Sequence, residues 1–144
     1  MNDPIAKLLE HKGCGVETTP QMTSVAQAVE KMNLRRIGSL VVVEQGEVVG
    51  IFTERDVLVR VVACGLDPLM TLVAKVMTPD PITVRPETPM MAAMAIITDH
   101  RCRHLPVVGD HGLCGMISAG DLTSYLVRSQ QRTIHDLEDF IRAA

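Results

Sequence analysis

Two pairs of a hydroxyl residue and an aspartate are the side chains in this sequence best placed to do chemistry. Thr53 and Asp56 lie in the stretch Gly-Ile-Phe-Thr-Glu-Arg-Asp, and Ser118 and Asp121 lie in the matching stretch Gly-Met-Ile-Ser-Ala-Gly-Asp. Each stretch predicts a strand followed by a helix that begins at the hydroxyl, because Ser and Thr are preferred N-caps and an acid three residues later completes a capping box. A helix N-terminus also attracts phosphate, and an aspartate beside it can accept hydrogen bonds from ribose hydroxyls. The residues alone leave both functions open, and the cap is the commoner one.

A metal centre and a catalytic thiol are the other chemistries to consider. His100, Cys102 and His104 lie close together, but their spacing fits no common zinc site, and zinc usually needs three or four protein ligands. A catalytic cysteine needs a base and an orienting group beside it, and the sequence indicates neither. We therefore predict no metal, no required cofactor and no enzymatic activity.

The composition narrows the range of partners. The net charge is −3 and the pI is about 5.9, which indicates no basic surface for nucleic acid or an anionic membrane. No apolar run reaches the ~18 residues of a membrane span, and the start of the chain does not resemble a secretory signal. The cysteines at positions 14, 64, 102 and 114 form no Cys-x-x-Cys pair, which favours reduced thiols. We expect a soluble cytoplasmic protein whose partner is a small molecule or another protein.

The two aspartate stretches belong to a longer repeat whose copies are 65 positions apart. At this offset Arg36 matches Arg101 and Leu40 matches Leu105, without a gap from about residue 25 to residue 56. Such self-similarity means that one supersecondary unit is built twice. Periodicity and turn residues predict the order strand, helix, strand, strand, helix in each copy. The predicted ranges are 16–19, 25–36, 39–43, 48–53 and 53–64 in the first copy, and 82–84, 90–100, 104–108, 113–118 and 118–131 in the second.

A leading helix and a connector complete the predicted body. Ile5, Leu8 and Leu9 have helical spacing ahead of Gly13, so a short helix leads into the first copy. The connector between the copies, residues 67–80, contains two prolines and predicts turns and at most a short helix.

A separate C-terminal helix is predicted from Thr133, where Thr-Ile-His-Asp resembles a capping box. Its apolar face consists of Ile134, Leu137, Phe140 and Ile141. A free helix of this length is marginal in water, so we expect it to dock on its own domain or across a dimer.

Several motifs together carry a family resemblance. They are the two Gly-x-x-(Ser/Thr)-x-x-Asp turns, Ile-Gly-Ser-Leu-Val-Val-Val at 37–43, Arg-Cys-Arg-His-Leu-Pro-Val-Val at 101–108 and Val-Met-Thr-Pro at 76–79. Over residues 16–128 the chain resembles a tandem pair of cystathionine-beta-synthase (CBS) domains, most closely the small stand-alone proteins of this family. The resemblance implies an α/β (α+β) fold in which two β-α-β-β-α repeats pack about a pseudo-twofold axis. The implied division is a helix and lead-in at 1–15, repeats at 16–66 and 81–131, a linker at 67–80 and an amphipathic helix at 132–144.

In that family two clefts between the repeats bind adenosine ligands such as AMP, ADP, ATP, NAD or S-adenosylmethionine. The resemblance implies a site A formed by Thr18, Thr19, Ile37, Gly38, Ser39, Met116, Ser118 and Asp121. It implies a site B formed by Thr83, Val84, Cys102, Arg103, His104, Ile51, Thr53, Arg55 and Asp56. In both, the aspartate is expected to hold ribose hydroxyls, the hydroxyl residue to bind ribose or phosphate, and the apolar residue two positions earlier to face adenine.

Site B is expected to bind phosphorylated ligands more tightly than site A. Arg103 and His104 can make charge-assisted hydrogen bonds to phosphate, whereas the matching Gly38 and Ser39 carry no charge. Arg55 adds a cation beside Asp56, where the other copy has a glycine. The alternative left open is that the arginines near the strand edge are solvated charges without a ligand.

By resemblance, the protein is a regulatory module that senses adenosine nucleotides and signals through a change in shape or association. A homodimer is expected, with helices 25–34, 57–64 and 90–97 as contact surfaces, and an unidentified protein partner is the other expected output. The alternative is a ligand-free structural or dimerisation module that regulates a partner protein. Such a module would need neither Asp56 nor Asp121.

Overall fold

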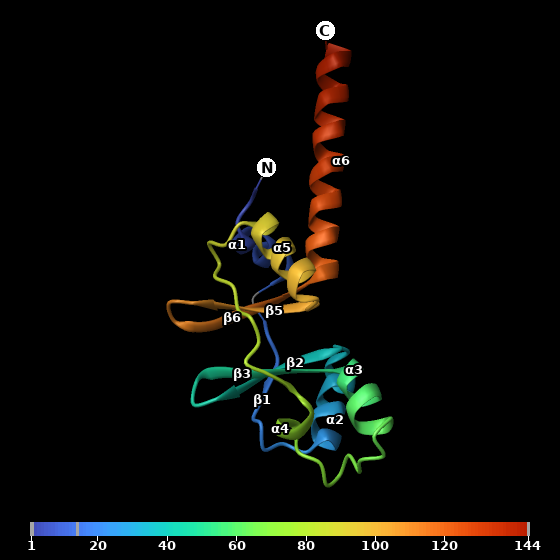
Figure 1. Cartoon of the computed structure of the whole chain (residues 1–144). Helices are drawn as coiled ribbons and strands as arrows, with labels where there is room; N and C mark the ends of the chain where they lie inside the picture. The colour runs from blue at the N-terminus through green and yellow to red at the C-terminus, as the bar shows by residue number, and fades with distance from the viewer. Residues whose placement is uncertain (1, 14, 144) are drawn as a thin grey trace.

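The computed structural model describes residues 2–13 and 15–143 and shows two α/β units, one above the other, with a long helix leaving the second (Figure 1). The first unit contains β1 (Thr18–Thr19), α2 (Val25–Arg35), β2 (Ser39–Glu44), β3 (Glu47–Thr53), α3 (Glu54–Asp56) and the π-helix η1 (Val57–Val62). The second contains α5 (Met90–His100), β5 (His104–Gly109), β6 (Gly112–Ser118) and α6 (Ala119–Ala143). Helix α1 (Ile5–Lys12) leads in, and α4 (Val73–Val76) and β4 (Thr78–Pro79) form the connector. The predicted fold class is confirmed.

The two hairpins have matching registers, as expected for a repeat. Ser39 pairs with Thr53 in the first, and His104 pairs with Ser118 in the second. Each ladder shifts at one position, after Val42 in the first hairpin and after Val107 in the second. The two positions are equivalent at the 65-residue offset. The repeat therefore includes the register shift of each hairpin.

The predicted strand at 82–84 is wrong as an element, because only Val84 pairs, in an isolated parallel bridge. In the first unit the N–H of Val41 donates to the carbonyl of Glu17 and extends the ladder ahead of β1. The matching residue in the second unit is Pro106, which has no N–H to donate. Pro106 thus accounts for the missing strand pairing around residues 82–84 in the second unit.

Strand β4 was not predicted, and it pairs antiparallel with β3 through Gly50 and Ile51. Gly50 permits this close approach because a Cβ there would lie 2.4 Å from Sδ of Met77 and 3.0 Å from the carbonyl oxygen of Thr78. The predicted helix after Thr53 is present, but it continues beyond α3 as the π-helix η1.

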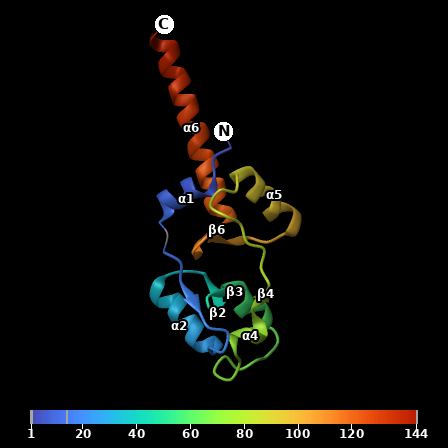
Figure 2. The ribbon, with the colours of Figure 1, turned by 90° about the vertical axis from the view of Figure 1, so that its left-hand side faces the viewer.

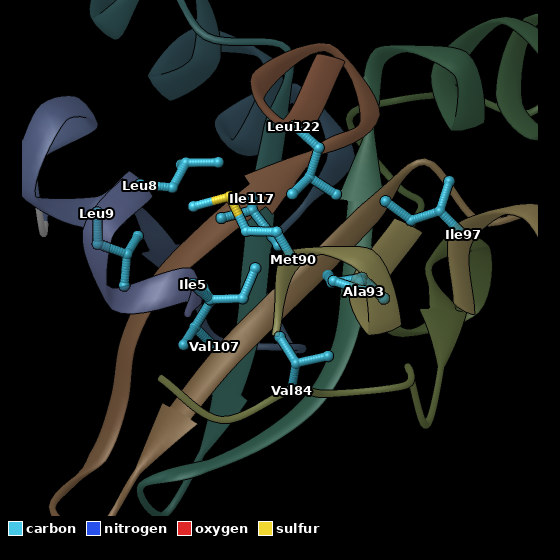
Figure 3. Packing of buried hydrophobic residues seen from close by; sticks show 11 residues of the cluster. Ile5, Leu8, Leu9, Val84, Met90, Ala93, Ile97, Val107, Ile117 and Leu122 are labelled. Atoms are coloured by element: carbon cyan, nitrogen blue, oxygen red, sulfur yellow. The ribbon is translucent and has the colours of Figure 1, made fainter. Parts of the chain in front are cut away.

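Each unit has its own apolar core, and each core is completed by the segment that leads into the other unit. Helix α1 precedes the first repeat, yet Ile5, Leu8 and Leu9 are buried in the core of the second (Figure 3). Helix α4 precedes the second repeat, yet Val73 and Val76 are buried in the core of the first. The leading segments therefore cross over and tie the two units together.

Helix α6 is one continuous helix of 25 residues, so the predicted end near Gln131 and the separate start at Thr133 are wrong. The Thr133 hydroxyl does not cap a helix start but donates to the carbonyl of Ser129, 3.1 Å away, as threonines inside helices do. The helix runs away from both units in two perpendicular views (Figures 1 and 2), and residues 134–143 are all exposed. Of the two docking arrangements that the sequence left open, docking on its own domain is therefore not observed. Neither α6 nor any other described helix is long and apolar enough to cross a membrane.

Candidate ligand cleft between the repeats

Both pairs of hydroxyl and aspartate form the capping boxes that the sequence predicts. The N–H of Thr53 donates to Oδ2 of Asp56 at 2.9 Å, and the N–H of Asp56 donates to Oγ1 of Thr53 at 3.3 Å. The N–H of Ser118 donates to Oδ2 of Asp121 at 2.9 Å, and the N–H of Asp121 donates to Oγ of Ser118 at 3.1 Å. A carboxylate accepts up to about four hydrogen bonds, so capping does not prevent either aspartate from holding a ligand.

A cleft of about 900 Å³ lies between the units and gathers most of the residues predicted for site B. These are Ile51, Thr53, Arg55 and Asp56 from the first repeat and Cys102, Arg103 and His104 from the second. Gly38, predicted for site A, lines this same cleft. Thr83 and Val84 do not line it; Thr83 is exposed, and Val84 is buried in the core of the second unit. The cleft lies within the usual size range of small-molecule sites.

The backbone explains why Gly38 and Arg103 occupy equivalent places in the cleft. The carbonyl of Gly38 accepts a 2.9 Å hydrogen bond from the N–H of Glu54, the first residue of α3. The carbonyl of Arg103 accepts a bond of the same length from the N–H of Ala119, the first residue of α6. Each bond holds the residue just before a hairpin against the first residue of the helix that follows that hairpin. The guanidinium of Arg103 then adds a charge that Gly38 cannot supply.

Arg60 and Arg101 also line the cleft, and sequence reasoning assigned neither to it. Nη1 of Arg60 donates to the carbonyls of Val76 and Met77 at 3.1 and 2.9 Å, and its Nε lies 3.7 Å from Oδ1 of Asp56. The spacing of Arg60 four residues after Asp56 on one helix was the signal that could have found it. Arg101 ends α5 in the left-handed conformation, with φ at 53°.

The charge of the cleft is mixed, with an excess of cations. Four arginines line it, at positions 55, 60, 101 and 103, together with the acids Glu54, Asp56 and Asp80. No sequence pattern pointed to Asp80, which enters from the connector between the units. An anionic ligand gains from such a cluster, and arginine pairs readily with phosphate.

Burial, together with the charges of Lys12 and Arg103, lowers the pKa of His104 below its ordinary value. Burial also raises the pKa of the Cys102 thiol. At neutral pH His104 is therefore uncharged and Cys102 stays protonated. The expected charge-assisted bond from His104 is not available in the free protein, and the positive charge of the cleft comes from its arginines.

The position around Asp121 is filled by a side chain of the protein itself. Nζ of Lys12 donates to Oδ2 of Asp121 at 2.6 Å and to the carbonyl of Met116 at 2.7 Å. Burial opposes ionisation of Asp121, but the bonds from Lys12 and Ser118 outweigh it and hold the pKa of Asp121 below its ordinary value. Sequence reasoning missed Lys12, because nothing in its surroundings marks it as the partner of a residue so distant in the chain.

Neither the large cleft nor the cavity beside Asp121 gathers the residues predicted for site A. Asp121 borders a smaller cavity of about 190 Å³ between α1 and α6, together with Lys12 and Tyr125. The other predicted residues except Gly38 border neither this cavity nor the large cleft, namely Thr18, Thr19, Ile37, Ser39, Met116 and Ser118. Thr19, for example, is buried and donates its hydroxyl hydrogen bond to Thr23 at 3.1 Å.

Two copies of one α/β unit, joined by crossed leading segments and sharing a cleft, define a tandem-repeat module. The chain matches the CBS domain family over residues 14–63 and 73–128 and belongs to it. The resemblance seen in the sequence is thereby confirmed. Pairs of CBS domains are generally regulatory or signal-transduction modules rather than catalysts.

Known proteins similar to this chain include the mitochondrial CBS domain-containing protein CBSX3 of Arabidopsis thaliana, 39% identical over 124 residues. That match covers 83% of this chain but only 60% of CBSX3, so the chain spans less than two thirds of this relative. A structure from Burkholderia ambifaria, described as a signal-transduction protein with CBS domains, aligns with a TM-score of 0.82 at 34% identity, covering 88% of this chain and 96% of that one. A hexameric CBS-CP12 protein from bloom-forming cyanobacteria aligns with a TM-score of 0.77 at 28% identity, covering 85% and 71%.

Proposed function

We propose that this protein is a regulatory module that binds an adenosine phosphate in the cleft lined by Asp56 and Arg103. One observation carries the proposal: Thr53 and Asp56 from the first repeat line the same cleft of about 900 Å³ as Arg103 and His104 from the second. A ligand that contacts both repeats stabilises one relative arrangement of them, and binding shifts such an equilibrium only by its differential affinity for the two arrangements.

The cleft residues divide into three roles. Asp56 accepts the ribose hydroxyls through Oδ1, since Oδ2 is engaged by the cap. Ile51 lies on β3 and lines the cleft, and its side chain faces the adenine ring. Arg103 and its neighbouring arginines hold the phosphate by charge-assisted hydrogen bonds.

The charges rank the candidate ligands. Four arginines favour AMP, ADP or ATP over adenosine, which has no phosphate. NAD carries two phosphates and is a weaker candidate only because its second nucleoside needs additional room. S-adenosylmethionine carries a sulfonium cation that these arginines repel, so it ranks last.

The test is calorimetry and thermal unfolding with AMP, ADP, ATP, NAD and S-adenosylmethionine. A ligand that binds only the folded state raises the melting temperature by mass action. We expect a phosphate ligand to bind the wild type and to bind more weakly to Asp56→Asn, a variant that keeps an oxygen for the cap. If none of the five ligands stabilises the wild type at millimolar concentration, the proposal fails.

The second candidate function is a ligand-free assembly module, and exposed apolar side chains favour it. Leu34 on α2, Leu58 and Val62 on η1 and Met91 on α5 are all exposed, and they lie on the helices expected to form dimer contacts. In this case purified protein self-associates and none of the five ligands changes its melting temperature or its mass.

A further inference from the structure

The projecting half of α6 carries an apolar face that nucleotide binding does not explain. Val127, Ile134, Leu137, Phe140 and Ile141 are 46%, 56%, 57%, 75% and 71% exposed. Most helical stability in proteins comes from packing of an apolar face, and an unpacked helix end is marginal in water. Several exposed apolar side chains on one face of a helix mark an interaction site.

We propose that a second copy of the chain covers this face in a short parallel two-helix coiled coil. Val127, Ile134 and Ile141 are spaced seven residues apart and take the a positions of a heptad, and Gln130 and Leu137 take the d positions. β-Branched residues at a with leucine at d favour two parallel helices. Two copies of one helix offer each other the same stripe, so the surface is complementary to itself. The proposal does not depend on nucleotide binding.

Gln130 sets the orientation of the pair. In a parallel, in-register pair it faces the partner's Gln130, and each amide both donates and accepts. An antiparallel pair would place Gln130 against the apolar end of the partner helix and leave its amide without a hydrogen bond, which costs free energy. The parallel register also sets Thr133 at a g position beside the partner's Glu138 at e, so no like charges meet there.

The polar side of α6 argues against a membrane as the alternative occupant. Helices that lie on anionic membranes are rich in lysine and arginine on the polar face. From residue 127 onward α6 carries equal numbers of arginines and acidic side chains, namely Arg128, Arg132 and Arg142 with Asp136, Glu138 and Asp139. A helix with no excess of positive charge has no electrostatic attraction to such a surface.

Sedimentation equilibrium of the full chain without ligand tests the interface. The double variant Ile134→Asp and Leu137→Asp puts two negative charges on the stripe, and Arg132→Glu makes the same net charge change at the outward f position. We expect the assembly mass of the double variant to be half that of the wild type at about 10–100 µM protein, while Arg132→Glu keeps the wild-type mass. Equal masses for all three proteins would overturn the proposal, whether the common state is monomeric or assembled.

Oxidative cross-linking tests the parallel orientation, because a disulfide needs two Cβ atoms about 4 Å apart. Leu137→Cys at a d position is expected to form a disulfide-linked dimer at least about tenfold faster than Asp139→Cys at f. Wild type treated with the same oxidant gives the background from native thiols such as the exposed Cys64. Cross-linking of both variants at the wild-type rate would show that the helices do not pair in parallel register and would overturn the proposal. Exclusive capture of a different protein by α6, with no self-association, would do the same.

Discussion

The ammonium group of Lys12 lies 2.6 Å from Oδ2 of Asp121. A lysine that precedes the first repeat therefore pairs with the aspartate of the second. At the 65-residue offset of the repeat, the residue that matches Lys12 is Met77, which has no ammonium group to pair with Asp56. Asp56 lines the large cleft, although its own side chain is only 11% exposed, and Nε of Arg60 lies 3.7 Å from its Oδ1. Two nearly equivalent aspartates thus differ in their cationic partners: Lys12 is hydrogen-bonded to the carboxylate of Asp121, whereas Arg60 only approaches that of Asp56.

Replacing Lys12 with alanine is expected to open a second ligand position at Asp121. The ion pair is partly exposed, with side-chain exposures of 40% and 28%, so its loss is expected to cost less than about 1 kcal/mol of stability. Calorimetric titration with AMP is expected to give a higher stoichiometry for Lys12→Ala than for the wild type. Lys7→Ala, on the same helix and paired only loosely with Asp3 at 3.9 Å, is the matched control. An unchanged stoichiometry in Lys12→Ala would show that Lys12 does not block the position.

Replacing Arg103 with alanine is expected to weaken the binding of AMP far more than that of adenosine. A hydrogen bond to a charged group is worth about 1.5–3 kcal/mol, so AMP should lose about tenfold or more in affinity. Arg85→Ala is the control, because Arg85 is exposed, pairs with Glu87 and Asp110 and does not line the cleft. Equal losses for AMP and adenosine would mean that Arg103 does not contact phosphate.

The lowered pKa of His104 is expected to make the affinity for AMP depend on pH. Burial, Lys12 and Arg103 lower the pKa of His104 in the free protein, and a bound phosphate beside the ring would raise it. Binding then takes up a proton, so affinity is expected to rise as the pH falls from about 8 toward 6. Calorimetry across this range should show a smaller slope for His104→Asn than for the wild type. The same slope in both proteins would assign the proton to another group.

The lowered pKa of His104 has the opposite consequence for the stability of the free protein. The unfolded chain binds the proton at a higher pH than the folded chain, so the free energy of unfolding should decrease as the pH falls below about 6.5. Urea unfolding without ligand, at pH values on both sides of this point, measures the effect. In His104→Asn this contribution should be absent, and a wild-type decrease that persists unchanged in the variant would contradict the assignment.

Replacing Gly115 with alanine is expected to destabilise the fold, because the new Cβ would lie 2.8 Å from Cδ2 of Leu9 on α1. Forcing an extra carbon into such a contact typically costs about 1–3 kcal/mol. Gly50→Ala should behave similarly, since its Cβ would meet both Met77 and Thr78. Gly15→Ala is the control, because nothing lies within 4 Å of the added carbon. Thermal unfolding of the three variants measures the effect, and equal melting temperatures would rule out a role for these close approaches.

Local features were predictable because neighbouring residues fix them. The capping box of Thr53 and Asp56 is closed by residues three positions apart, and the hairpins depend on turn residues between adjacent strands. The strand around Val84 was predicted from the same kind of pattern and fails, because its extension depends on an N–H that Pro106 lacks. Pro106, on the neighbouring strand, therefore decided that the strand around Val84 does not extend.

The sequence by itself determined the repeat, the two helix caps and the family, because these depend on short spacings that recur in both copies, and seven of the nine residues it predicted for site B line the cleft around Asp56. The tertiary structure alone decided that the leading segments cross over between the units and that α6 continues past Thr133 into solvent. It also decided that the two aspartates are not equivalent. Lys12 and Asp121 are 109 positions apart, and only the packing of α1 on the second unit brings an ammonium group to that carboxylate.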